Sequence, residues 1–119
     1  MKISKELLKG STATMILKVI SEGDSYGYEI TQKIAARSKE VFKLNEGTLY
    51  PILTRQKNQG LLTYRWEESP QGPPRKYYSL SEEGRRTLAQ LDESWEELVE
   101  QVRAIRHGDR NITAVEPIE

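Results

Sequence analysis

Apolar residues recur at helical spacing in three stretches of the first 60 residues. Such spacing places the apolar side chains on one face of a helix, and polar or glycine-containing segments separate the stretches. The pattern therefore predicts three helices before Gly60, which is a suitable residue just after the end of the third. The predicted helices are Leu7 to Ser21, a second from Asp24 or Ser25 to Glu40, and a third that is capped by Asn45 or Thr48.

After the third helix, the pattern changes to a two-residue alternation. Residues Leu62 to Glu67 alternate between apolar or aromatic and polar, and Tyr77 to Leu80 repeat the alternation. Because alternation is typical of a strand with one buried face, Leu62, Tyr64 and Trp66 are expected to face the core. The connection, ESPQGPPR, holds three prolines and a glycine, which favours an irregular loop between two paired strands. Three helices followed by a hairpin is the order of a winged helix, with the hairpin as its wing.

A longer helical pattern follows the hairpin, from Ser81 to Gly108. Its apolar residues are spaced alternately by three and four, as in a helix that packs along another helix. Such a helix is about 40 Å long, more than a small winged helix can cover. The favoured partner is the same helix of a second chain, and the alternative is that the helix folds back on its own domain. The predicted interface residues are Leu88, Leu91, Trp95, Leu98, Val102 and Ile105.

The net charge is zero, but the charges are unevenly distributed along the chain. Residues 1–79 hold 13 Lys and Arg against 8 Asp and Glu, a net +5, whereas residues 80–119 hold 5 against 10, a net −5. A basic part joined to an acidic part indicates that the first binds an anionic partner such as nucleic acid. The alternative is an ordinary scatter of surface charge.

Composition argues against several classes of function. The chain has no cysteine and a single histidine, His107, so neither disulfides, thiol chemistry nor a His/Cys metal site is expected. No apolar run approaches the roughly 20 residues of a membrane span, and no signal-peptide pattern is present, which predicts a cytoplasmic location. No nucleophile with a base and no phosphate-binding loop appears. We therefore expect neither an enzyme nor a cofactor.

The start of the third helix combines residues that allow close approach to another molecule. Gly47 removes a side chain, and Pro51 is expected within the first turn, where its missing N–H costs little. Thr48 can cap the helix or donate its hydroxyl to a phosphate, and the phenol of Tyr50 can reach another phosphate. The alternative places Tyr50 in the core. Arg55, further along, is either a backbone contact or a solvated charge.

Three motifs stand in the same order and at compatible spacing: YGYEI from Tyr26 to Ile30, EGTLYPIL from Glu46 to Leu53, and GPPRKYYSLSEEG from Gly72 to Gly84. Together they resemble the PadR family of bacterial transcriptional regulators, over about residues 5 to 107. The resemblance implies that Thr48, Leu49, Tyr50 and Pro51 lie near the start of a recognition helix, and that Arg75 and Lys76 lie on the wing.

The predicted fold class is mostly α with a small β-hairpin: a winged helix-turn-helix followed by a long C-terminal dimerisation helix. We expect a DNA-binding domain at residues 1–80, a dimerisation helix at 81–108 and a mobile tail at 109–119. The predicted function is that of a dimeric repressor that recognises a palindromic operator in double-stranded DNA. The alternative is a winged helix that binds only proteins. The predicted DNA contacts are Thr48, Tyr50, Pro51, Arg55, Arg75 and Lys76.

A small-molecule effector is the least constrained part of this interpretation. At the axis of a two-fold dimer, the indole of Trp95 would lie close to its copy in the second chain, and two facing indoles make a flat apolar slot. Val99 lies one turn further on and would share that slot. The hypothesis is that a planar aromatic compound binds there and releases the repressor from DNA. The alternative is that Trp95 simply fills the interface.

Overall fold

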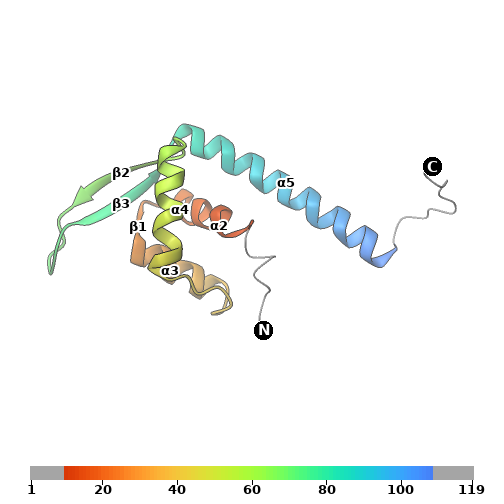
Figure 1. Cartoon of the computed structure of the whole chain (residues 1–119), viewed down its shortest axis with the longest axis horizontal. Helices are drawn as coiled ribbons and strands as arrows, with labels where there is room; N and C mark the ends of the chain where they lie inside the picture. The colour runs from red at the N-terminus through yellow and green to blue at the C-terminus, as the bar shows by residue number, and fades with distance from the viewer. Residues whose placement is uncertain (1–9, 109–119) are drawn as a thin grey trace. The chain divides into compact units, whose positions relative to one another are not determined.

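The computed structural model describes residues 10–108, which form four helices and three strands. The strands make one antiparallel sheet in the order β1-β3-β2. This is a winged helix with a long C-terminal helix, as the sequence predicts (Figure 1). In chain order the elements are α2 (Thr12–Ser21), β1 (Ser25–Tyr26), α3 (Gly27–Arg37), α4 (Glu46–Asn58), β2 (Leu62–Glu67), β3 (Arg75–Leu80) and α5 (Glu82–His107).

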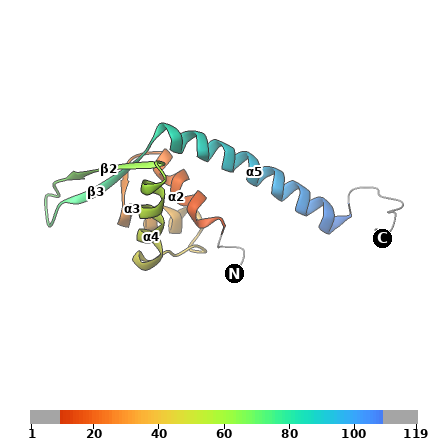
Figure 2. The same cartoon turned by 45° about the horizontal axis from the view of Figure 1, so that its top comes forward.

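The core of the winged helix lies between α2, α3, α4 and the base of the sheet, and Figure 2 gives a second view of these elements. Each of the three helices contributes the apolar face that its periodicity predicts. The hairpin contributes residues only from its inner end. The buried core consists of Ile16, Leu17, Val19, Ile20, Ile30, Ile34, Leu49, Leu53, Leu62, Tyr78, Leu80 and Leu88.

The start of α3 differs from the prediction. Neither Asp24 nor Ser25 caps it, because Ser25 and Tyr26 form the short strand β1 and pair with β3. Tyr26 is the residue before the helix, and its N–H donates to the Glu29 carboxylate at 3.3 Å. The helix also ends at Arg37, three residues before the predicted end. Of the first predicted helix, residues 12–21 are helical and residues 7–9 lie outside the described range.

The start of α4 is set by Asn45, one of the two predicted caps. Its side-chain oxygen accepts a hydrogen bond from the N–H of Thr48 at 2.9 Å. Because the helix therefore begins at Glu46, Pro51 lies in the second turn and not, as predicted, in the first. A proline there has no N–H to donate to the carbonyl four residues earlier, that of Gly47. The predicted residue after the helix, Gly60, has a φ of +78°, a conformation that favours glycine.

The two long strands pair as predicted, but the predicted buried face is largely wrong. Leu62 is buried, whereas Tyr64 is 39% exposed and Trp66 is 63% exposed. The reason is that β2 and β3 extend beyond the helices, so only the inner end of the hairpin has a core to cover (Figure 1). Alternation therefore identified the strand correctly, but it could not show how much of the strand the helices cover.

The first turns of α5 pack on the winged helix. Ser81 caps the helix as predicted, accepting from the N–H of Gly84 at 3.0 Å, and its hydroxyl donates to the carbonyl of Gly60 at 2.6 Å. A methyl group on Gly84 would stand 2.2 Å from the carbonyl oxygen of Leu61, so this helix needs glycine to approach the backbone just before β2. Contacts divide the chain into two compact units between Ala89 and Gln90, whereas the sequence placed a domain boundary at residue 80. The predicted tail, 109–119, lies outside the described residues.

Candidate nucleic-acid interface

The outer surface of α4 is defined by the residues that it buries. Leu49, Leu53 and Gln56 face inward. At 3.6 residues per turn, the opposite side is a row of exposed residues that would meet any approaching molecule first. Sequence reasoning singled out Pro51 but not Thr54 or Asn58, although the same helical spacing could have identified both. The outer row of α4 consists of Gly47, Pro51, Thr54 and Asn58.

The other predicted contact residues of α4 lie on its two flanks. Thr48 and Arg55 are exposed on one flank, and helical spacing places Tyr50 on the other. Tyr50 is 42% exposed, so it does not belong to the core. Its hydroxyl lies against the start of α3, where a methyl group on Gly27 would be 2.6 Å away. Burial raises the pKa of the Tyr78 hydroxyl, and the neighbouring phenols of Tyr50 and Tyr64 raise it further.

The two predicted wing cations, Arg75 and Lys76, project from opposite faces of the hairpin because they are consecutive residues of β3. The guanidinium of Arg75 stacks over the ring of Tyr26, 4.4 Å from its centroid. The ammonium of Lys76 lies over the ring of Tyr64 at 4.0 Å. Lys57, from the Tyr50 flank of α4, lies 5.6 Å from the centre of the same Tyr64 ring. Such cation–π contacts orient a cation without neutralising it.

Ion pairing distinguishes these cations from Arg37, Lys43 and Arg65 of the winged helix. Arg65 lies on the same hairpin, but it binds the carboxylates of Asp24 at 2.6 Å and Glu67 at 2.7 Å. The hydrogen bond from Arg65 lowers the pKa of the Asp24 carboxyl, so this pair stays charged down to acidic pH. Within residues 10–108, no carboxylate lies within 4 Å of the cations that α4 and β3 present: Arg55, Lys57, Arg75 and Lys76.

Beyond Gln90, α5 presents a row of exposed apolar side chains, which we call the exposed seam. It consists of Leu91, Trp95, Leu98, Val102 and Ile105, whose exposures range from 36% for Leu91 to 78% for Ile105. Leu88, the first residue of the predicted interface, is a correction. It is 6% exposed, because the first turns of α5 pack on the winged helix and place Leu88 in the core of its own chain.

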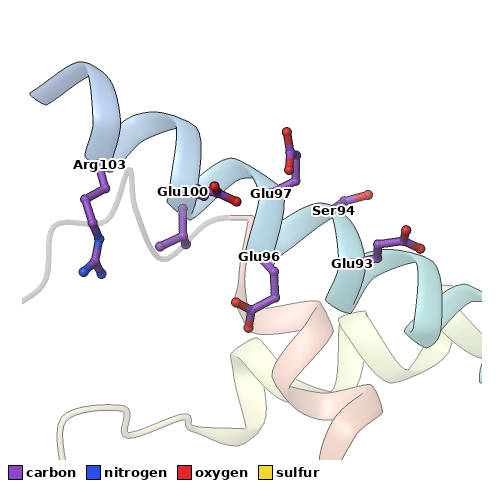
Figure 3. A pocket seen from close by; sticks show the side chains of 7 residues that line it. Glu93, Ser94, Glu96, Glu97, Glu100 and Arg103 are labelled. Carbon is purple, nitrogen blue, oxygen red and sulfur yellow. The ribbon is translucent and has the colours of Figure 1, made fainter. Parts of the chain in front are cut away.

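An open hollow runs along α5, and all the residues that line it come from this helix (Figure 3). Val99 is among them and Trp95 is not. Four of the lining residues are glutamates, yet within the described part of the chain no three His, Cys, Asp or Glu side chains gather as a metal site requires. At 3.6 residues per turn, most of these residues lie on the side of α5 opposite the exposed seam, so the hollow is not the slot predicted beside Trp95. The lining residues are Glu93, Ser94, Glu96, Glu97, Val99, Glu100 and Arg103.

Comparison with known proteins assigns the family. Residues 16–90 match the transcriptional regulator PadR-like family, and this range runs from the middle of α2 through the wing to the first turns of α5. The chain belongs to this family. The predicted family and fold class are thus confirmed, and the protein is a transcriptional regulator of the PadR family. None of the helices in residues 10–108 is long and apolar enough to span a membrane.

Similar PadR-like proteins have been solved. The structure of a PadR-like transcription factor from Bacteroides fragilis is 43% identical, with a TM-score of 0.72, and the match covers 84% of this chain and 94% of that one. A transcriptional regulator from Clostridium thermocellum is 33% identical, with a TM-score of 0.78, over 85% and 95%. The transcriptional regulator YqjI of Escherichia coli K12 is 30% identical over 95 residues. This match covers 80% of the chain but 44% of YqjI, so the chain spans less than half of that relative's length.

Proposed function

We propose that the PadR-like protein acts in the cytoplasm as a homodimeric repressor that binds a palindromic operator in double-stranded DNA. The observation that supports this most directly is the group of four cations on α4 and β3 that lack a carboxylate partner within residues 10–108. A phosphate backbone would neutralise such cations and release counterions, which is the main source of affinity in DNA binding. A winged helix that binds only proteins would not explain why these four cations lack carboxylate partners.

In this proposal, α4 enters the major groove, which is about 12 Å wide and admits a helix. Its outer row then meets the base edges, with Pro51 closest to the groove floor together with Thr54 and Asn58. The hydroxyls of Thr48 and Tyr50 donate to phosphates on the two sides of the groove, because the two residues lie on opposite flanks. Arg55, Arg75 and Lys76 contribute further phosphate contacts, which position the protein without reading sequence.

The exposed seam of α5 supports the dimer. Five apolar side chains on one face of a helix are a surface that a second copy of the same helix would cover, with each seam packed on the other about a two-fold axis. Leu91, Trp95, Leu98, Val102 and Ile105 are the proposed interface, and Leu88 remains in the core of its own chain. A two-fold dimer presents two copies of α4 to half-sites about 34 Å apart.

Effector release is the finer part of the proposal. A second copy of α5 packed along the exposed seam would bring the two Trp95 indoles together, with Val99 one turn further on at the edge of the seam. A planar aromatic compound bound there releases DNA only if it has a higher affinity for the dimer that cannot bind DNA, and a tenfold loss of operator affinity needs about 1.4 kcal/mol of coupling. Such compounds should quench the indole fluorescence of the Trp66→Phe variant, in which Trp95 is the remaining tryptophan. They should not bind the Trp95→Ala variant. Without quenching in the first variant, Trp95 is an interface residue and no more.

The test of DNA binding is a titration of labelled duplex from the region upstream of the protein's own gene, at several salt concentrations. Arg75→Ala and Lys76→Ala should each lower the slope of log affinity against log salt by about one unit. Arg86→Ala is a matched control, because Arg86 is held by Glu83 at 2.6 Å on α5, and its slope should stay that of the parent. A folded protein without salt-dependent binding would instead favour the protein-binding alternative.

A further inference from the structure

One face of the hairpin changes from core to solvent along its length. It holds three cross-strand pairs: Leu62 with Leu80, Tyr64 with Tyr78, and Trp66 with Lys76. We call the outer two pairs the aromatic face of the wing. Tyr78 is buried at 4% exposure, Tyr64 is 39% exposed and Trp66 is 63% exposed. Exposure therefore increases toward the outer end, and the largest apolar side chain of the wing is the one that its own chain covers least.

Two cations lie close to the rings of this face. The ammonium of Lys76 is 4.0 Å from the centre of Tyr64 and 5.7 Å from the centres of both Trp66 and Tyr78. On the side of α4, Lys57 lies 5.6 Å from the centre of Tyr64. Neither lysine has a carboxylate within 4 Å in the described range, so the apolar strip carries two cations without an ion-pair partner there.

On the opposite face of the hairpin, most side chains contact one another. There Tyr77 packs edge-on against Tyr26 of β1, with ring centres 5.3 Å apart. Arg65 lies 5.4 Å from the centre of Tyr77 and is held by the carboxylates of Asp24 and Glu67. Apart from Arg75, which stacks over Tyr26 without a carboxylate partner in the described range, these groups pair with one another, so the exposed rings of the wing lie on the aromatic face.

We infer that the indole of Trp66 packs on a deoxyribose of the DNA strand that borders the groove entered by α4. The inference rests on the proposed DNA binding. A nucleic-acid strand alternates phosphate and sugar, so an exposed apolar ring beside a lysine matches a sugar beside a phosphate. The reach is adequate: a six-residue strand is about 20 Å long, which exceeds the roughly 12 Å width of the major groove.

The first test separates a sugar contact from a charge contact. Trp66→Ala should lower affinity for the upstream duplex about tenfold, and to a similar extent on a scrambled duplex, because the sugar carries no sequence information. The salt slope should stay that of the parent, since no charge is lost, whereas Lys76→Ala lowers it by about one unit. Trp66→Phe keeps a ring and should retain most of the affinity. Unchanged affinity in Trp66→Ala, or a slope that falls as in Lys76→Ala, would overturn the inference.

The second test observes the indole directly. In Trp95→Phe, all indole emission comes from Trp66, and saturating duplex should quench it or shift it to shorter wavelength. In Trp66→Phe, the same duplex should change the emission much less. Saturated binding without any change in Trp66 emission contradicts the inference while leaving the proposed function intact. If the parent protein itself does not bind duplex, the proposed function fails, and the inference fails with it.

Discussion

The winged helix and the part of α5 beyond Gln90 use apolar residues in opposite ways. In the winged helix, Ile16, Leu49 and Leu53 are completely buried by the chain itself. In outer α5, Trp95, Leu98 and Ile105 are half exposed or more. Both segments have the periodicity of an amphipathic helix. Periodicity therefore indicates which side of a helix is apolar, but it does not say whether the same chain or another one covers that side.

The two parts therefore differ in what buries their apolar residues. The winged helix buries its apolar residues within one chain. The exposed seam is shielded from water only when another molecule covers it. In our proposal, that molecule is a second copy of the chain. Damage to the first part should therefore unfold the protein, whereas damage to the second should separate its subunits.

The largest expected effect comes from the same substitution made in both regions. Leu53→Asp places a carboxylate in a closed core and should unfold the winged helix, because burying an unpaired charge costs several kcal/mol. Leu98→Asp should leave the winged helix folded, since residue 98 is 54% exposed in a single chain, but should yield monomers. Circular dichroism and sedimentation at micromolar concentration distinguish the two results. A Leu98→Asp protein that still sediments as a dimer would place the interface elsewhere.

A second comparison tests how firmly the first turns of α5 belong to the winged helix. In Gly84→Ala, the new methyl group meets a backbone carbonyl at 2.2 Å, so we expect a loss of about 1–3 kcal/mol in the free energy of unfolding, as for an overpacked core. Gly23→Ala is the control, because nothing lies within 4 Å of its added methyl group. Denaturant unfolding measures both. Equal stabilities would mean that α5 does not need this close approach to the backbone just before β2.

The Tyr50 hydroxyl tests whether the winged helix carries the DNA contacts independently of the dimer. Tyr50→Phe keeps the ring on α3 but removes the proposed phosphate donor. We expect about tenfold weaker binding to the upstream duplex, in line with one lost hydrogen bond to a charged group, without change in melting temperature or sedimentation. Normal DNA binding by this variant would assign Tyr50 to packing alone.

The smallest expected effect is the pH dependence of the Asp24 contact with Arg65. The folded-state pKa of Asp24 lies below its usual value of 3.8, mainly because Arg65 donates to the ionised carboxylate. The contact therefore stabilises the fold above this pH, and the contribution disappears as the pH falls through the folded-state pKa. The Asp24→Asn variant should have a slightly lower melting temperature than the parent at neutral pH. In strong acid the two melting temperatures should be equal. A constant difference across this range would mean that the ionisation of Asp24 is not the cause.

Much of this fold could be predicted from sequence because its elements are long and regular. The seam spacing located α5 to within a residue at each end, and the side-chain chemistry of Ser81 and Asn45 identified two caps. Strand β1 could not be predicted, since two residues have no periodicity and owe their conformation to pairing with β3. The exposure of Trp66 could not be predicted either, because it depends on where the body beneath the hairpin ends.

The candidate site was predicted in part, for similar reasons. Sequence placed Arg75 and Lys76 together on the wing, but their projection from opposite faces follows from strand geometry and was overlooked. Thr54 and Asn58 were missed although helical spacing was enough to find them. Leu88 was assigned to the interface because it continues the seam, and only packing reveals that its own chain buries it.

The most direct test of the account is the mass of the complex formed with duplex DNA from the upstream region, measured by sedimentation at low salt. The account predicts two chains per duplex for the parent protein. It also predicts that Leu98→Asp, whose winged helix stays folded, binds much more weakly because each chain must then bind by itself. A parent complex that contains one chain per duplex, or no complex at any salt concentration, would contradict the proposal of a dimeric DNA-binding repressor.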